Sequence, residues 1–179
     1  MNIANTITSV RIILIPIMAL LFFLHSDGPK YYVTFIFIIA AISDYLDGYL
    51  ARKMNQVSKL GKFLDPVADK LLVITSLLLI LNENNNLIIF IPICIIVLRE
   101  MIVSALREWV LLESFSKPLD VNKYGKFKTL FQMLSIGFLL FNGTVFTIST
   151  YMIGLYGIYI AAFLSLVSMI IYLKDVIKS

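Results

Sequence analysis

The sequence predicts an all-α integral membrane protein of six transmembrane helices, with the N- and C-termini both in the cytoplasm. Of the 179 residues, 60% are hydrophobic and the mean hydropathy is +0.93, whereas soluble domains are only about 45–50% apolar. Six apolar runs approach the roughly 20 residues that a helix needs to cross a bilayer. One membrane domain over residues 1–179 is therefore expected, with no room for a second soluble domain.

The apolar runs predict the helices in order. They cover Thr8–Leu24, Tyr31–Leu50, Phe63–Leu81, Leu87–Leu111, Phe127–Phe141 with extensions on either side, and Thr150–Leu173. Turn-forming compositions separate the first helix from the second at 26–30, the third from the fourth at 82–86, and the fifth from the sixth at 142–144. Longer basic breaks, at 52–62 and 113–126, separate the remaining pairs.

Basic residues are divided unequally between the two kinds of break. The three turn-like breaks contain one, Lys30, whereas the longer breaks and the C-terminal end contain Arg52, Lys53, Lys59, Lys62, Lys117, Lys123, Lys126, Lys174 and Lys178. The positive-inside rule places this basic side and both termini in the cytoplasm. The net charge of +4 then reflects orientation and anionic lipid, and we expect no nucleic acid partner.

An acidic and glycine-containing face ends the second predicted helix. Asp44, Asp47, Gly48, Ala51 and Arg52 follow the spacing i, i+3, i+4, i+7, i+8, which places them on one side of a helix. The two small residues leave a trough in which a phosphate can approach the backbone. The arginine offers a planar fork for phosphate oxygens.

A second acidic pair opens the third predicted helix. Asp65 and Asp69 share one helix face with Gly61 if the helix begins before Pro66. Alternatively, Asp65 caps a helix that starts at Pro66, and Gly61 is then a loop residue. A short cytoplasmic link joins the second and third helices, so they should run antiparallel and their acidic faces can meet.

Converging carboxylates need cations. Four of them within a few ångströms cannot all stay ionised alone, and oxygen ligands favour Mg²⁺ or Mn²⁺ over Zn²⁺. Two such ions about 3.5–4 Å apart would clamp a phosphoryl group. Either pair by itself is better explained as a solvated cap or a salt-bridged face. Both together, with small residues and an arginine in register inside a membrane domain, favour a functional site.

Further basic and polar residues are candidates for binding the phosphate of an acceptor substrate. The set comprises Lys62, Arg107, Lys126 and Lys128, with Thr8 and Arg11 from the first helix. Ordinary interfacial or orienting charge is the alternative explanation for them. Arg99 lies deep enough to need a partner, and a glutamate of its own or a neighbouring helix is the simplest one.

These residues resemble the signature of the CDP-alcohol phosphatidyltransferase family. The pattern D-x-x-D-G-x-x-A-R-x8-G-x-x-x-D-x-x-x-D is present at every fixed position, from Asp44 to Asp69. Segments over most of the chain, such as Asn5–Arg11, Gln56–Lys70, Arg99–Trp109 and Gly125–Met133, resemble the bacterial phosphatidylglycerophosphate synthase branch.

The resemblance implies a six-helix membrane enzyme of the bacterial inner membrane, usually a homodimer. It would transfer the phosphatidyl group of CDP-diacylglycerol to the primary hydroxyl of sn-glycerol 3-phosphate and release CMP. By analogy, the residues that hold two divalent ions are Asp44, Asp47, Asp65 and Asp69, and the last is also the favoured general base. Those that border the cytidine diphosphate are Gly48, Ala51, Arg52 and Gly61.

Two alternatives remain open at this point. The acceptor could instead be inositol phosphate, serine or phosphatidylglycerol, because the signature does not discriminate among these. A cation transporter that uses buried carboxylates is the other alternative. A transporter predicts acidic groups near the midplane, often in paired repeats, whereas here they cluster at one end and no repeat is visible.

Overall fold

The computed structural model describes residues 3–24, 30–53, 59–112 and 123–178. Within these ranges, side chains are not described at 3–7, 44–53, 59–60, 62–63, 111–112, 123–124, 126, 175 and 177–178. The described chain forms the helices α1 (Ile3–Leu24), α2 (Tyr31–Lys53), α3 (Lys59–Glu83), α4 (Leu87–Leu112), α5 (Lys123–Phe141) and α6 (Thr150–Lys178). The predicted all-helical architecture and the order of its helices are confirmed.

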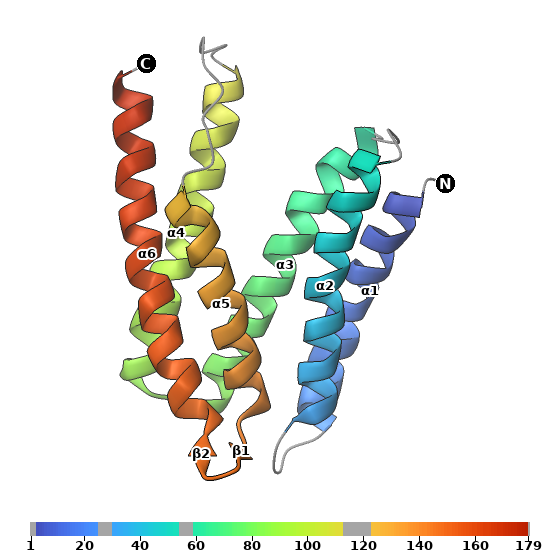
Figure 1. Ribbon diagram of the computed structural model, residues 1–179, viewed down its shortest axis with the longest axis vertical. Coiled ribbons are helices and arrows are strands. Elements are labelled where there is room, and N and C mark those ends of the chain that lie inside the picture. Colours follow the sequence, from blue (N-terminus) through green and yellow to red (C-terminus); the bar gives the residue numbers. More distant parts are fainter. Residues whose placement is uncertain (1–2, 25–29, 54–58, 113–122, 179) are drawn as a thin grey trace.

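Successive helices run in alternating directions, so α1 begins and α6 ends at the same end of the bundle (Figure 1). We call this the terminal end. Helix α3 is central, because it contacts α1 and α2 on one side and α4 and α5 on the other. Toward the terminal end, the group formed by α1, α2 and α3 diverges from α4, α5 and α6 (Figure 1).

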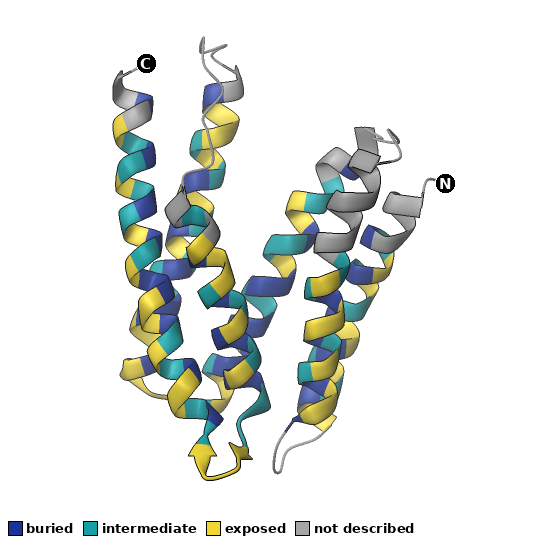
Figure 2. Ribbon diagram, viewed as in Figure 1, coloured by how far each residue is buried: buried dark blue, intermediate teal, exposed yellow. Residues whose placement is uncertain are grey.

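The interior holds a main apolar core to which every helix contributes, and a smaller cluster of Val103, Val110, Tyr172 and Val176 lies between α4 and α6. Met18, Phe37, Leu77, Ile136 and Ile158 are among the buried members of the main core. Every helix also has exposed residues (Figure 2), and many of these are large and apolar, such as Leu20, Phe35 and Phe163. Such a surface is a liability in water and is expected of helices in lipid. Among the described residues, Leu87–Val110 and Thr150–Lys174 are long and apolar enough to cross a membrane, while Thr8–Leu24, Tyr31–Ser43 and Phe127–Phe141 are shorter apolar helices.

Helices α5 and α6 pack closely because glycine lies at their contact. A Cβ at Gly154 would lie 2.6 Å from Cγ of Leu139, and one at Gly157 would lie 2.2 Å from Oγ of Ser135. Small residues of this kind let two membrane helices approach each other. The close contact holds α6 against the helix that carries part of the polar site described below.

A short hairpin joins α5 to α6 at the end opposite the termini. Strands β1 (Thr144–Val145) and β2 (Ile148–Ser149) pair antiparallel, where the sequence indicated only a turn. At the same end, Lys30 is buried, and its Nζ lies 2.7 Å from Oε1 of Glu83 at the end of α3. This ion pair ties the start of α2 to the end of α3 and so helps to fix the register of the two helices.

Candidate functional site

Helix α3 settles the alternatives that Pro66 left open. The helix begins at Lys59 and continues through the proline, so Asp65 is not a helix cap and Gly61 is helical. Gly61 is buried, and Asp65 and Asp69 are half-buried one turn apart. The predicted common face of these three residues is therefore present on α3.

The first polar contact of this face is made with α1. The hydroxyl of Thr8, which is fully buried, donates a hydrogen bond of 2.6 Å to Oδ1 of Asp65. A donor at this distance from a carboxylate is a strong, charge-assisted partner. It orients the carboxylate and satisfies one of its lone pairs, so Thr8 positions Asp65. The part that we predicted for Thr8 in binding the acceptor stays a prediction.

The other acidic pair lies on α2. Asp44 and Asp47 are helical, as are Gly48, Ala51 and Arg52, but their side chains lie outside the described part of the structure. Helix α2 contacts α3, and α2 ends where α3 begins, at the terminal end (Figure 1). The convergence of the four carboxylates stays a prediction.

The described half of this predicted metal centre has suitable chemistry. Asp65 and Asp69 supply carboxylate oxygens one turn apart, which suits a hard divalent cation, and Thr8 orients one of them. No group of three or more histidine, cysteine, aspartate or glutamate side chains that could hold a metal occurs among the described residues. The side chains of Asp44 and Asp47 are not among those described, so the described residues fit a cation as part of its set of ligands.

A polar cavity of about 260 Å³ lies between α3, α4 and α5. Asp69 lines it from α3, Arg107 from α4 and Lys128 from α5. The other polar residues that line it are Lys70, Arg99, Glu100, Thr129 and Gln132. The cavity thus joins the last residue of the acidic series to two of the basic residues predicted to bind the acceptor. Four of its side chains are cationic and two are acidic, so it favours an anion.

Glu100 organises the charges of this cavity. Its Oε1 forms an ion pair with Nζ of Lys128, which is buried, and its Oε2 lies 3.9 Å from the guanidinium of Arg99. Arg99 also donates a hydrogen bond of 2.9 Å to Oγ of Ser168 on α6. The expectation that Arg99 needs a glutamate partner is confirmed. Serine was not predicted to be its second partner. The guanidinium of Arg107 lies 5.8 Å from the centre of the Tyr172 ring.

The remaining predicted acceptor residues are placed differently. Arg11 is fully buried on α1 and is not among the described residues that line the cavity. The side chains of Lys62 and Lys126 lie outside the described part of the structure. Sequence reasoning missed Glu100 and Gln132 as members of the site. The spacing i, i+4 from Lys128 to Gln132, which places both on one face of α5, was the available signal.

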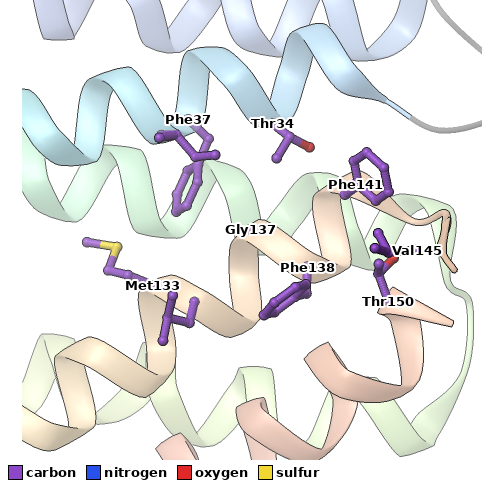
Figure 3. Close-up of a pocket in the computed structure, with 10 residues that line it drawn as sticks. Thr34, Phe37, Met133, Gly137, Phe138, Phe141, Val145 and Thr150 are labelled. Atoms are coloured by element: carbon purple, nitrogen blue, oxygen red, sulfur yellow. The ribbon is translucent and has the colours of Figure 1, made fainter. Parts of the chain in front are cut away.

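A second cavity, of about 300 Å³, is lined almost entirely by apolar side chains of α2 and α5 (Figure 3). Phe37 and Thr34 line it from α2, Phe138 and Phe141 from α5. None of the described residues that line it is charged, so this lining suits hydrocarbon better than a phosphate. Met133 borders both cavities.

The exposed apolar residues are typical of a helical membrane protein, and the cavity is lined by more cationic than acidic side chains. The chain belongs to the CDP-alcohol phosphatidyltransferase family, whose model matches residues 1–173. This family is membrane-bound and generally uses divalent metal ions.

Three bacterial relatives are similar over nearly the whole chain. Each is named CDP-diacylglycerol–glycerol-3-phosphate 3-phosphatidyltransferase. The protein from Haemophilus influenzae is 42% identical and covers 97% of this chain and 92% of its own. That from Wigglesworthia glossinidia brevipalpis is 40% identical, with 96% and 93% covered. That from Escherichia coli K12 is 37% identical, with 97% and 93% covered.

Proposed function

We propose that this protein transfers the phosphatidyl group of CDP-diacylglycerol to sn-glycerol 3-phosphate, giving phosphatidylglycerophosphate and CMP. The names of its relatives support this reaction. The observation that carries it for this chain is that Asp69 shares one cavity with Lys128 and Arg107. A carboxylate that can accept a proton thereby lies beside cations that can bind a phosphate, which suits an acceptor bearing both a hydroxyl and a phosphate.

The chain's own groups divide the work of a single in-line displacement. Lys128 and Arg107 bind the acceptor phosphate, and Asp69 takes the proton from the primary hydroxyl as that oxygen attacks the β-phosphorus of the nucleotide lipid. Arg52 stabilises the CMP that leaves. Direct attack is preferred over a covalent intermediate, because the candidate nucleophiles in the motif are carboxylates with other tasks.

The metal site is part of the same proposal. Asp44, Asp47, Asp65 and Asp69 would hold two ions, Mg²⁺ or Mn²⁺. When bound, such ions neutralise the charge on phosphate oxygens. Gly48, Ala51 and Gly61 would let the nucleotide approach the helix backbones. Thr8 supports the arrangement by orienting Asp65.

We further propose how the protein lies in its membrane. All six helices cross the bacterial inner membrane as one domain, with both termini and the acidic site on the cytoplasmic side, and two copies form a homodimer. The alternating helix directions (Figure 1) support this topology. So do the basic residues of the two longer breaks at 52–62 and 113–126.

The test is CMP release by the purified protein from CDP-diacylglycerol. Glycerol 3-phosphate, glycerol, inositol phosphate, serine and phosphatidylglycerol are compared side by side, and glycerol 3-phosphate should be the best acceptor. Asp69→Asn should lose turnover by about 10²-fold or more while CDP-diacylglycerol still binds. Arg107→Ala should raise the KM for glycerol 3-phosphate much more than the KM for CDP-diacylglycerol. Lys174→Ala is the matched control, because Lys174 is an exposed cationic residue on α6.

The outcomes of this comparison separate the alternatives. If serine or phosphatidylglycerol is the best acceptor, the family chemistry stands but the proposed acceptor is wrong. Near-normal turnover of Asp69→Asn would remove that residue from the role of base. Ion uptake into vesicles without any release of CMP would favour the transporter instead.

A further inference from the structure

One polar group of the charged cavity has no assigned task. Gln132 lies on α5, lines the cavity and is only 2% exposed. Its Oε1 is buried and has no hydrogen-bond partner among the residues that the structure describes. A buried acceptor without a donor is unfavourable, and such groups in native proteins need an explanation. A ligand that brings a donor into the cavity would supply one.

The surrounding groups narrow the choice of ligand. Glu100 already has partners, because its carboxylate pairs with Lys128 and lies near the guanidinium of Arg99. Thr129 also has one, because its hydroxyl donates to the carbonyl oxygen of Gly125 at 2.9 Å. Among the described residues that line the cavity, Gln132 is the one with a side-chain amide. An uncharged amide oxygen attracts a hydroxyl donor, and it does not attract a phosphate, which carries only acceptors at its anionic oxygens.

The spacing of Gln132 from Lys128 indicates which hydroxyl could reach it. Residues four apart on a helix are neighbours, with Cβ atoms about 5–6 Å apart. A ligand whose phosphate contacts Lys128 can therefore present an adjoining hydroxyl to Gln132. In sn-glycerol 3-phosphate the secondary hydroxyl lies on the carbon between the phosphate-bearing carbon and the reacting primary hydroxyl.

We propose that Gln132 is a specificity-determining residue that accepts a hydrogen bond from the secondary hydroxyl of glycerol 3-phosphate. This inference rests on the proposed function, because the same cavity must hold the acceptor. Three groups of the acceptor are then held: its phosphate by Lys128 and Arg107, its primary hydroxyl by Asp69 and its secondary hydroxyl by Gln132. A site built to bond a hydroxyl discriminates strongly against an analogue that lacks it, because the buried acceptor is then left unpaired.

The test compares two acceptors that carry the same reacting groups. 3-Hydroxypropyl phosphate has the primary hydroxyl and the phosphate of glycerol 3-phosphate but lacks the secondary hydroxyl. With saturating CDP-diacylglycerol, CMP release gives kcat/KM for each acceptor. The wild-type protein should prefer glycerol 3-phosphate by about 10–100-fold, the range expected for one hydrogen bond to a buried group.

Variants then assign the preference to one side chain. Gln132→Met keeps a similar length without the amide, and it should lower kcat/KM for glycerol 3-phosphate by the same factor. The value for 3-hydroxypropyl phosphate and the KM for CDP-diacylglycerol should stay within about 3-fold, because one bond alone is removed. Ser135→Ala is the matched control: its hydroxyl on α5 donates to the carbonyl oxygen of Phe131, outside the cavity lining. If Gln132→Met does not fold, Gln132→Asn, which retains a shorter amide, replaces it and should lose part of the preference.

The results distinguish a failure of the Gln132 contact from a failure of the proposed reaction. A wild-type protein that uses both acceptors equally well overturns the role of Gln132 without any variant, and leaves the proposed reaction standing. A Gln132→Met protein that keeps the preference does the same. If neither acceptor supports CMP release while serine does, the proposed function itself fails and the inference falls with it.

Discussion

The hydrogen bond from Thr8 to Asp65 predicts how strongly α1 supports the acidic site. Thr8→Val keeps the shape of a fully buried side chain and removes the hydroxyl that lies 2.6 Å from Oδ1. Hydrogen bonds to charged groups contribute about 1.5–3 kcal/mol, and about 1.4 kcal/mol is a factor of ten. Groups that orient a metal-binding side chain have effects of this size, since their loss typically costs about 10–100-fold in metal affinity or activity.

The assay is CMP release as a function of Mg²⁺ concentration. Thr8→Val should raise the half-saturating concentration of Mg²⁺ by about 10-fold or more. Thr34→Val is the matched control, because the hydroxyl of Thr34 on α2 is buried without a hydrogen-bond partner among the described residues. It should leave the Mg²⁺ dependence unchanged. If the two valine variants respond to Mg²⁺ alike, the bond between Thr8 and Asp65 has no part in cation binding and the reasoning is refuted.

Two further predictions concern the metal and the packing of the bundle. Activity should vanish in EDTA and return with Mg²⁺ or Mn²⁺ but poorly with Zn²⁺, because the motif has no histidine or cysteine; full activity after rigorous chelation would contradict the metal site. Gly154→Ala should lower the thermal unfolding midpoint in detergent, because its Cβ would lie 2.6 Å from Cγ and 3.0 Å from the backbone nitrogen of Leu139. Overpacking costs about 1–3 kcal/mol, and a clash that includes a backbone atom should lie in the upper part of this range, above the gain in helix propensity of about 1 kcal/mol. Gly137→Ala is the control, since among the described residues its Cβ would meet Phe37 alone, at 3.9 Å. Equal midpoints for the two variants would show that the contact can relax.

The sequence was most informative about the order of the helices and least informative about their ends. Apolar runs mark the part of a helix that suits lipid, whereas backbone hydrogen bonding continues into polar residues. For this reason α6 extends to Lys178, past the predicted end at Leu173. Likewise α3 begins at Lys59, ahead of the predicted Phe63. The hairpin at 144–149 escaped prediction because strands of two residues are too short to show an alternating pattern.

In the site, too, relations between residues close in the sequence were predictable, whereas contacts between distant residues were not. The common face of Asp65 and Asp69 follows from helical spacing and is present. The partners that lie far apart in the chain were not predictable from spacing: Thr8 and Asp65 are 57 residues apart, and Arg99 and Ser168 are 69 apart. Burial of a single oxygen, as at Gln132, depends on how three helices pack, and one sequence carries no pattern for it.

In the proposed reaction, the central position of α3 would let one bundle bind two substrates. Asp65 is held from α1, whereas Asp69, one turn further along, lines the cavity between α3, α4 and α5. The aspartates of the signature thus belong to α2 and α3, whereas the basic residues of the cavity come mainly from α4 and α5, where Glu100 is paired with Lys128. A nucleotide lipid drawn to cations at the acidic side and a phosphorylated alcohol drawn to the basic side would meet at Asp69. In the proposed reaction that carboxylate would belong to both sides, and it would accept the proton of the acceptor while the phosphoryl group is held.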